Sequence, residues 1–273
     1  MSKPANMLSA IEPWDLVANG YAGTTMQILA RYADEAIDAA HLKTGAKILD
    51  VACGPGTLAL MVAREAGEVH GIDFSEPMLD IFKQHVERTG LSNISIRHGD
   101  AQSLPYADNT FDAAFSMFGL MFFPDRYRGF AEIYRTLKPG GSIAVTSWAP
   151  IDRSPAMQMM FGATQTINPG IPEPQKSIDT LENPDVFKQE MLVAGFRDVK
   201  VQSVTRFAFP VTSIPIFWDD MVKGSAPIQM MKKSMGEAAW KEKEVLAIGY
   251  LEEKLAELPT RLSSDAWLGV GIK

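Results

Sequence analysis

Short apolar runs alternate with amphipathic segments between Lys47 and Ser147, and this alternation restricts the possible folds more than any other feature of the chain. Apolar runs of this length, bounded by turn residues, are typical of strands buried on both faces. The segments between them repeat apolar side chains at helical spacing. We therefore predict an α/β fold with a mostly parallel sheet and helices on both of its faces. The strands predicted in this region cover Lys47 to Val51, Glu68 to Asp73, Asn93 to His98, Phe111 to Ser116 and Ser142 to Ser147.

The pattern continues on both sides of this region. Before it, Met26 to His41 predicts an amphipathic helix. After it, a methionine-rich stretch (Met157 to Phe161) and a proline-rich loop (Pro169 to Pro174) predict an insertion over the sheet. Two further strands, Val199 to Phe209 and Ala266 to Ile272, then resume the framework. Helices are also predicted over Thr57 to Ala66, Glu76 to Thr89, Tyr127 to Leu137, Asp185 to Ala194 and Glu237 to Leu258, and a turn over Lys138 to Gly141.

These elements divide the chain into four predicted segments. They are an N-terminal helical cap (residues 1–44), a ligand-binding α/β core (45–150), a lid insertion (151–182) and a remainder (183–273) that holds strands six and seven and further cap helices. Hydrophobic residues make up 46% of the chain and charged residues 22%, which leaves ample apolar surface for a core.

Charge and composition narrow the classes of partner. The net charge of −7 and the lack of a basic cluster disfavour a nucleic-acid partner. A single cysteine, Cys53, forms no internal disulfide and no cysteine-based metal site, and it fits a reducing compartment. No apolar run approaches the ~18 residues of a membrane span, and Met1 to Ser9 lacks the features of an export signal. We expect a cytoplasmic protein with no metal, no membrane span and no nucleic-acid partner, and a homodimer remains open.

Three features after successive strands indicate a nucleoside site. The first strand runs into a turn with Gly54 and Gly56, where the backbone can approach a ligand closely because no Cβ intervenes. Asp73 ends the second strand 19 positions after Gly54, where a carboxylate can accept hydrogen bonds from both ribose hydroxyls. Asp100 and the backbone N–H of Ala101 follow the third strand and can read the edge of adenine. Together these features are far more specific than the glycine turn alone.

A dinucleotide enzyme is the first alternative. Gly54, Gly56 and Ala59 also satisfy the G-x-G-x-x-A fingerprint of nicotinamide and flavin proteins, so an NAD(P)-dependent oxidoreductase shares this pattern. Asp50 in the strand before the turn, the third acid at Asp100 and the absence of a visible pyrophosphate site favour a single nucleoside.

From Ile48 to Trp148 the chain resembles the class I methyltransferases that use S-adenosylmethionine (SAM), especially the small-molecule branch with the ubiquinone and menaquinone methyltransferases. The resemblance implies a Rossmann-like sheet of seven strands, with the last inserted antiparallel between the fifth and sixth. The matching segments are Leu49 to Gly56, Gly71 to Leu79, Gly99 to Ala101, Leu104 to Tyr106, Phe111 to Asp112 and Leu137 to Gly141.

The same resemblance implies a set of cofactor-binding residues. Ala52 stands where many members have a glycine, which leaves open a SAM-binding protein without transferase activity. Asp50 belongs to the set as the acid that leads into the turn. The other implied contacts are Tyr21 to the cofactor carboxylate, Ala52 and Gly54 to its methionine part, Asp73 to the ribose, Phe74 and Met78 to the adenine faces, Asp100 and Ala101 to the adenine edge, and Ser116 and Met117 to the sulfonium side.

The implied reaction is an in-line displacement, in which positioning supplies much of the acceleration and a general base is optional. No catalytic residue is therefore assigned. His98 is interpreted as a buried structural residue and His70 as a structural residue inside the second strand. His41 and His85 are interpreted as residues on solvated helix faces.

The acceptor is predicted to be a small, largely apolar or aromatic molecule. Met121 and Phe122 are apolar where relatives often place a polar group toward the substrate, although both could equally fill core. The methionine-rich stretch suits a lid over an irregular ligand. Trp14 and Trp218 are further candidates for closing the pocket.

Overall fold

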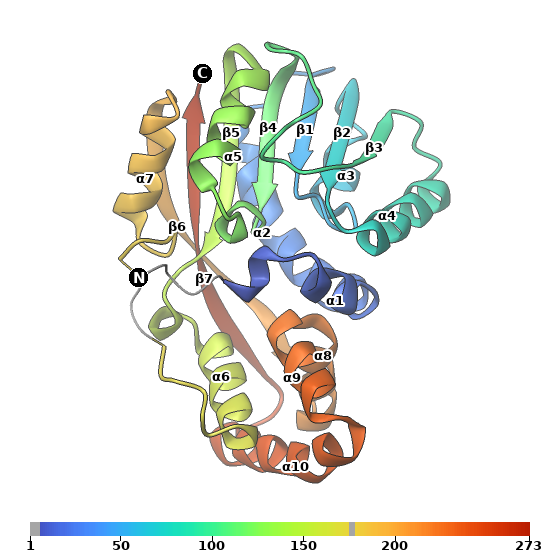
Figure 1. Ribbon diagram of the computed structural model, residues 1–273, viewed down its shortest axis with the longest axis vertical. Coiled ribbons are helices and arrows are strands. Elements are labelled where there is room, and N and C mark those ends of the chain that lie inside the picture. Colours follow the sequence, from blue (N-terminus) through green and yellow to red (C-terminus); the bar gives the residue numbers. More distant parts are fainter. Residues whose placement is uncertain (1–5, 175–177) are drawn as a thin grey trace.

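The computed structural model describes residues 6–174 and 178–273. Residues 1–5 of the predicted cap and 175–177 of the predicted insertion lie outside this range. Within it, the strands form one seven-stranded sheet in the order β3-β2-β1-β4-β5-β7-β6 (Figure 1). The strands are β1 (Lys47–Val51), β2 (Glu68–Asp73), β3 (Ile94–His98), β4 (Phe111–Met117), β5 (Leu137–Trp148), β6 (Arg197–Val211) and β7 (Thr260–Ile272).

The directions of the strands confirm the predicted fold class. β1 to β5 pair in parallel, and β7 pairs antiparallel with both β5 and β6. The last strand is therefore inserted between the fifth and the sixth, as expected. Ile48, Leu49 and Val51 of β1 are fully buried because helices cover both faces of the sheet.

α2, α3, α4, α5, α7 and α10 agree with the predicted helices to within a few residues. For α1, α6, α8 and α9 no bounds were predicted, although further cap helices were expected after residue 183. The predicted helix from Thr57 is shorter than expected and ends at Val62. The helices are α1 (Glu12–Gly23), α2 (Thr25–Ala40), α3 (Thr57–Val62), α4 (Glu76–Thr89), α5 (Arg126–Thr136), α6 (Pro155–Ile167), α7 (Pro184–Val193), α8 (Ile214–Gly224), α9 (Ala226–Met235) and α10 (Glu237–Lys254), with 3-10 turns η1 (Met7–Ser9), η2 (Leu120–Phe122) and η3 (Ile151–Arg153).

Local chemistry explains where the helices next to the sheet edge begin. Gly56 precedes α3 with φ +88°, and a Cβ at this position would overlap the ring of Phe82, so only glycine fits. Ser75 caps α4, since its Oγ accepts a hydrogen bond from the backbone N–H of Met78. Both helices therefore start directly after the strand ends that carry the candidate site.

The predicted turn from Lys138 to Gly141 lies inside β5. Leu137 pairs with Phe111, and Ser142 pairs with Ala113, so the residues between Leu137 and Ser142 loop out of the ladder. Gly140 adopts φ +79° within this loop.

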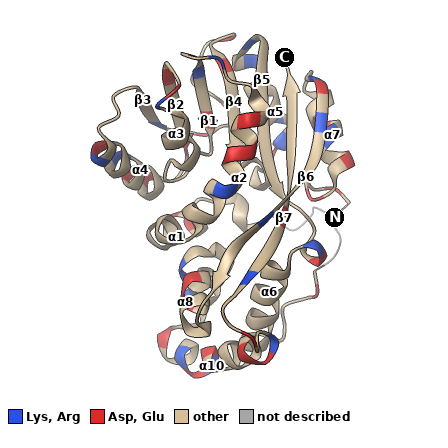
Figure 2. Cartoon of the chain, turned by 180° about the vertical axis from the view of Figure 1, so that it is seen from behind, with Lys and Arg blue, Asp and Glu red and all other residues tan. Residues whose placement is uncertain are grey.

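A second lobe lies below the sheet, where β6 and β7 extend past the other strands and α6, α8, α9 and α10 pack around them (Figure 1). Trp218 and Trp240 stack in this lobe with ring centroids 6.0 Å apart. Acidic and basic residues are interspersed along its helices, as α10 shows in the view from behind (Figure 2). The helices of the lobe come from both sides of residue 182, and the proposed boundaries at 44, 150 and 182 stay a prediction.

Candidate functional site

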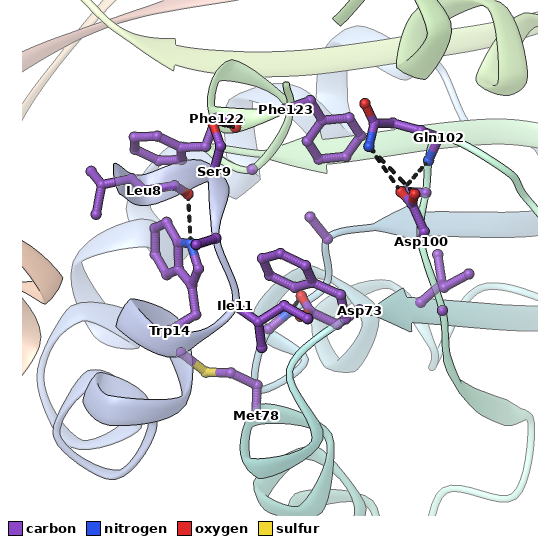
Figure 3. A pocket seen from close by; sticks show the side chains of 18 of the residues that line it. Leu8, Ser9, Ile11, Trp14, Asp73, Met78, Asp100, Gln102, Phe122 and Phe123 are labelled. Carbon is purple, nitrogen blue, oxygen red and sulfur yellow. Dashed lines mark hydrogen bonds between the residues drawn. The ribbon is translucent and has the colours of Figure 1, made fainter. Parts of the chain in front are cut away.

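A cavity of about 600 Å³ opens at the carboxyl ends of β1, β2 and β4, and beside the loop after β3 (Figure 3). This is the edge at which parallel α/β sheets bind ligands. The N-terminal segment, which comprises η1 and α1, closes the cavity on its other side. Asp50 and Ser116 do not line the cavity, whereas the other predicted cofactor residues do: Tyr21, Ala52, Gly54, Asp73, Phe74, Met78, Asp100, Ala101 and Met117.

Asp73 is held by the backbone on both of its carboxylate oxygens. The N–H of Gly54 donates to Oδ2 at 2.8 Å, and the N–H of Ser75 donates to Oδ1 at 2.9 Å. Burial raises the pKa of Asp73, and the hydrogen bonds from Ser75 and Gly54 oppose that rise. Gly54 itself has φ +52° and open space where a Cβ would stand, so the turn offers bare backbone to the cavity.

Ala52 and Gly119 approach each other where the loops after β1 and β4 meet. Ala52 adopts φ +55°, and a Cβ on Gly119 would overlap the Cβ of Ala52. The methyl group that distinguishes Ala52 from the more usual glycine therefore fits because residue 119 has no side chain.

Asp50 and Ser116 lie outside the cavity, and their side chains accept hydrogen bonds from the backbone of elements next to it. Oδ2 of Asp50 accepts a hydrogen bond of 3.1 Å from the N–H of Ala59 at the start of α3. Burial raises the pKa of Asp50 to about 7. Asp50 lines a small void of about 30 Å³ beneath the glycine turn, together with Tyr21. Oγ of the buried Ser116 accepts a hydrogen bond of 3.2 Å from the N–H of Leu120, which holds η2 in place.

Two polar residues, Asp100 and Gln102, interact in the loop after β3, and of the two only Asp100 was predicted as a site residue. Oδ1 of Asp100 accepts a hydrogen bond of 2.8 Å from the N–H of Gln102. Oε1 of Gln102 in turn accepts one of 2.9 Å from the N–H of Asp125. Gln102 lines the cavity but was not predicted, because nothing in its spacing distinguishes it from an ordinary loop residue.

His98 corrects one of the sequence interpretations. It was interpreted as buried, but it is exposed and lines the cavity, with Nε2 3.0 Å from the carbonyl oxygen of Phe74. The reason is that β3 is the edge strand of the sheet, so alternation along it does not ensure burial. His70 is structural as predicted, since it contacts Glu68 and packs edge-on against the ring of Tyr106.

The predictions for the two histidines on helical segments had different outcomes. His41 is exposed at the end of α2, which confirms the solvated position. His85 is instead half-buried, with Nδ1 3.1 Å from the carbonyl oxygen of Pro55.

The N-terminal segment forms the roof of the cavity. Nε1 of Trp14 donates to the carbonyl oxygen of Leu8 at 2.9 Å, and Oγ of Ser9 donates to that of Phe122 at 2.7 Å. Oγ of Ser75 donates to Asp15 at 2.6 Å and so joins α1 to the start of α4. Of these roof residues Trp14 and Phe122 were proposed from sequence, and the others were not, because they contact the site through tertiary packing alone.

Tyr21 lies at the centre of the site, since it lines this cavity, the small void and a second cavity. Within the described part of the chain its hydroxyl makes no hydrogen bond. Burial, and then the charge of Asp73, raise the pKa of this phenol well above its usual value, so the hydroxyl stays protonated.

The second cavity, of about 380 Å³, adjoins the first. Phe118, at φ +58°, lies in the shared wall and packs against Trp148 with ring centroids 4.1 Å apart. Met157 and Met160 of the predicted lid line the second cavity. The residues common to both cavities are Leu8, Trp14, Tyr21, Phe118 and Phe122.

Two expected pocket residues lie elsewhere. Met121 packs against the hydrophobic core, and its Sδ lies 3.7 Å from Oγ of Ser147. The neighbouring Phe122, by contrast, lines both cavities. Trp218 is buried against Trp240 and lines neither of the two large cavities.

Two features are absent from residues 6–174 and 178–273. No helix there has the length and apolar character needed to span a membrane. No group of three or more His, Cys, Asp or Glu side chains there is arranged to hold a metal ion.

Comparison with known proteins agrees with this geometry. Residues 48–141 match a family model described as a methyltransferase domain. A demethylmenaquinone methyltransferase from Staphylococcus haemolyticus is 35% identical over 182 residues, which cover 60% of this chain and 74% of that protein. The chain belongs to the class I SAM-dependent methyltransferases. This membership does not favour the alternative of an NAD(P)-dependent oxidoreductase.

Two further proteins, one curated relative and one solved structure, are similar to this chain over different shares of its length. A demethylmenaquinone methyltransferase from Listeria welshimeri is 37% identical over 123 residues, 44% of this chain and 52% of that protein. The chain thus spans about half the length of the first curated relatives it matches. The crystal structure of the YcgJ protein from Bacillus subtilis has a TM-score of 0.59 at 18% identity, covering 89% of this chain and 98% of that one, and it supports the fold alone.

Proposed function

We propose that this chain transfers a methyl group from SAM to a small, largely apolar or aromatic molecule. The observation that carries the proposal is the junction of two cavities. The larger one has the carboxylates of Asp73 and Asp100 at neighbouring strand ends, and the smaller one is mainly apolar and shares a wall with it. The name of the curated relatives, demethylmenaquinone methyltransferase, supports a small-molecule acceptor.

The residues of the larger cavity fit SAM. Each oxygen of Asp73 accepts one backbone N–H and keeps a lone pair, so both can accept hydrogen bonds from ribose hydroxyls. The open face of Gly54 leaves room for the methionine part of the cofactor. We assign Ala52, Phe74, Met78, Asp100, Ala101, Met117 and Tyr21 the contacts implied by the family resemblance, with Asp50 and Ser116 as supporting residues.

When bound, SAM supplies a methyl group activated by its sulfonium sulfur. The chain's own contribution is to position the two reactants and to exclude water, which Trp14, Phe118 and Phe122 do at the shared wall. None of the described residues common to both cavities is a carboxylate, a histidine or a lysine. Tyr21 is protonated and has no hydrogen-bond partner in the described ranges, so its hydroxyl can donate a hydrogen bond there but does not serve as a base.

Methyl-labelled SAM tests the proposal, incubated with a panel of phenolic and quinone-like acceptors. Calorimetry with S-adenosylhomocysteine (SAH) runs in parallel. We expect SAH binding and time-dependent label in at least one acceptor. Binding of SAH with no labelled product across the panel and a metabolite extract would favour a SAM-binding protein without transferase activity. No binding of SAM or SAH would exclude both functions.

We further infer a cytoplasmic protein with no nucleic-acid partner, and the oligomeric state stays open between a monomer and a homodimer. The net charge of −7 and the interspersed charges of Figure 2 support the second inference. The single buried Cys53 supports a reducing compartment. Light scattering of the purified chain tests the dimer, which a monomer mass would exclude.

A further inference from the structure

The second cavity is mainly apolar, but its polar side chains are not spread evenly around it. Its apolar walls come from α6, α8, β6 and the shared aromatic wall, and include Met157, Met160, Phe209 and Phe217. The hydroxyl, amide and charged side chains that line this cavity and not the larger one are Thr24, Thr25, Gln27 and Arg31, at or near α2, Asp220 on α8, and Ser225 directly after α8. None of these polar residues lines the larger cavity. A molecule bound in the second cavity can therefore contact these side chains, whereas a molecule confined to the larger cavity cannot.

Arg31 has a charge that the surrounding protein does not neutralise. Glu35 stands one helical turn further along α2, where it would ordinarily pair with Arg31. Glu35 instead pairs with Arg206, whose Nη2 lies 2.6 Å from Oε2 of Glu35. Nε of Arg206 also donates to the carbonyl oxygen of Arg31 at 2.8 Å. Across residues 6–174 and 178–273, Arg31 forms no ion pair. A guanidinium without a partner thus borders an apolar cavity.

Asp220 does not supply the missing counter-charge. It is exposed, and its pKa is raised by burial and then by Asp219, while Lys223 lowers it. Those neighbours lie on the same helix, and Arg31 is not among the groups that act on it. The two charged residues therefore stand apart on the rim of the cavity.

We propose that the second cavity binds the methyl acceptor and selects an aromatic molecule with an anionic substituent, which Arg31 binds. A mainly apolar pocket with a few polar groups fixes the orientation of its ligand through those groups. A guanidinium binds carboxylate, sulfonate or phosphate oxygens through two parallel N–H donors. Arg31 then holds one end of the acceptor, and the aromatic body packs against Phe118 and Trp148 near the shared wall. This inference rests on the proposed function, because it takes the larger cavity as the cofactor site.

Two naphthylamine dyes with the same aromatic body test it. 8-Anilinonaphthalene-1-sulfonate carries a sulfonate, and N-phenyl-1-naphthylamine is uncharged. Both are titrated by fluorescence into protein saturated with SAH, so that the larger cavity is filled. Arg31→Met should weaken binding of the anionic dye about tenfold, the usual effect of losing one charge-assisted contact, and leave the neutral dye unchanged. Arg64→Met, at an exposed arginine outside both cavities, is the matched control and should change neither.

Met160→Trp tests the location of the dyes, because the larger side chain fills the second cavity. Both dyes should lose at least tenfold in affinity, while SAH affinity, measured on the same samples, stays within about twofold. An unchanged ratio of the two dye affinities in Arg31→Met, with SAH still bound, overturns this inference and leaves the proposed function standing. Failure of the wild-type protein to bind SAH overturns both. Circular dichroism confirms that each variant is folded.

Discussion

The backbone N–H of Gly54 lies 2.8 Å from Oδ2 of Asp73, so the turn after β1 directly holds the carboxylate at the end of β2. Ser75 holds the other oxygen from the start of α4. The carboxylate is therefore fixed in position before a ligand binds, which lowers the entropy cost of binding.

Asp73→Asn should weaken SAH binding about 100-fold. The substitution removes a buried charge and replaces one acceptor oxygen with a donor, which conflicts with the backbone N–H groups and with any ribose hydroxyls. Calorimetry measures the affinity. Asp80→Asn, on the exposed surface of α4, serves as control and should bind like wild type. Wild-type affinity in a folded Asp73→Asn protein would contradict the assignment of the cofactor site.

Gly119→Ala and Ala52→Gly should compensate each other. The new methyl at residue 119 overlaps the Cβ of Ala52 and must displace the loops that line the larger cavity. We expect Gly119→Ala alone to weaken SAH binding roughly tenfold, and the double variant to recover most of the loss, as contacting residues in a double-mutant cycle do. Purely additive effects would show that the two loops do not touch in solution.

Gly56→Ala should cost about 3 kcal/mol of unfolding free energy in urea. The alanine must adopt φ +88°, and its Cβ overlaps the buried ring of Phe82, so strain and overpacking add. Gly140→Ala is the matched control, since it has φ +79° but open space around its Cβ. It should cost only about 1 kcal/mol, and equal losses at the two positions would contradict the close contact with Phe82.

Stability should depend on pH through Asp50. Its pKa of about 7 in the folded protein exceeds the ordinary value of 3.8, so the folded state binds this proton more tightly. The resulting stabilisation is complete below the ordinary pKa and is lost as the pH rises through about 7. From about pH 5 to about pH 8 the wild-type unfolding free energy should fall by about 2 kcal/mol more than that of Asp50→Asn.

Urea denaturation at a series of pH values measures this difference. Asp80→Asn should retain the wild-type dependence, because Asp80 lies on the surface. Parallel pH profiles for wild type and Asp50→Asn would rule out the titration of Asp50 in this range.

Predictions from sequence succeeded where the information is local. β1 and β2 begin and end where expected, because apolar runs and turn residues mark strand limits directly. The placement of Asp73 and Asp100 in one cavity also followed from sequence, since consecutive parallel strands bring their carboxyl ends to one edge. Where Asp50 and Ser116 lie relative to the cavity did not follow. Ser116 comes one position before Met117, which lines the cavity, so it faces the opposite side of the sheet. Asp50 lies within β1, two positions before Ala52, and its carboxylate is directed to the start of α3.

The amino-acid sequence by itself determined the order of strands and helices, the glycine turn and the two carboxylates that follow it, because each of these depends on neighbours along the chain. Only the tertiary structure decided that Trp14 and Phe122 form the roof and the shared wall, that Met121 is directed into the core, and that His98 is exposed. It also brought Arg206 to Glu35, so that Arg31, beside the second cavity, has no ion pair with any residue that the structure describes. The physical reason is that these contacts join residues far apart in the chain, and no local pattern records which partner a side chain meets.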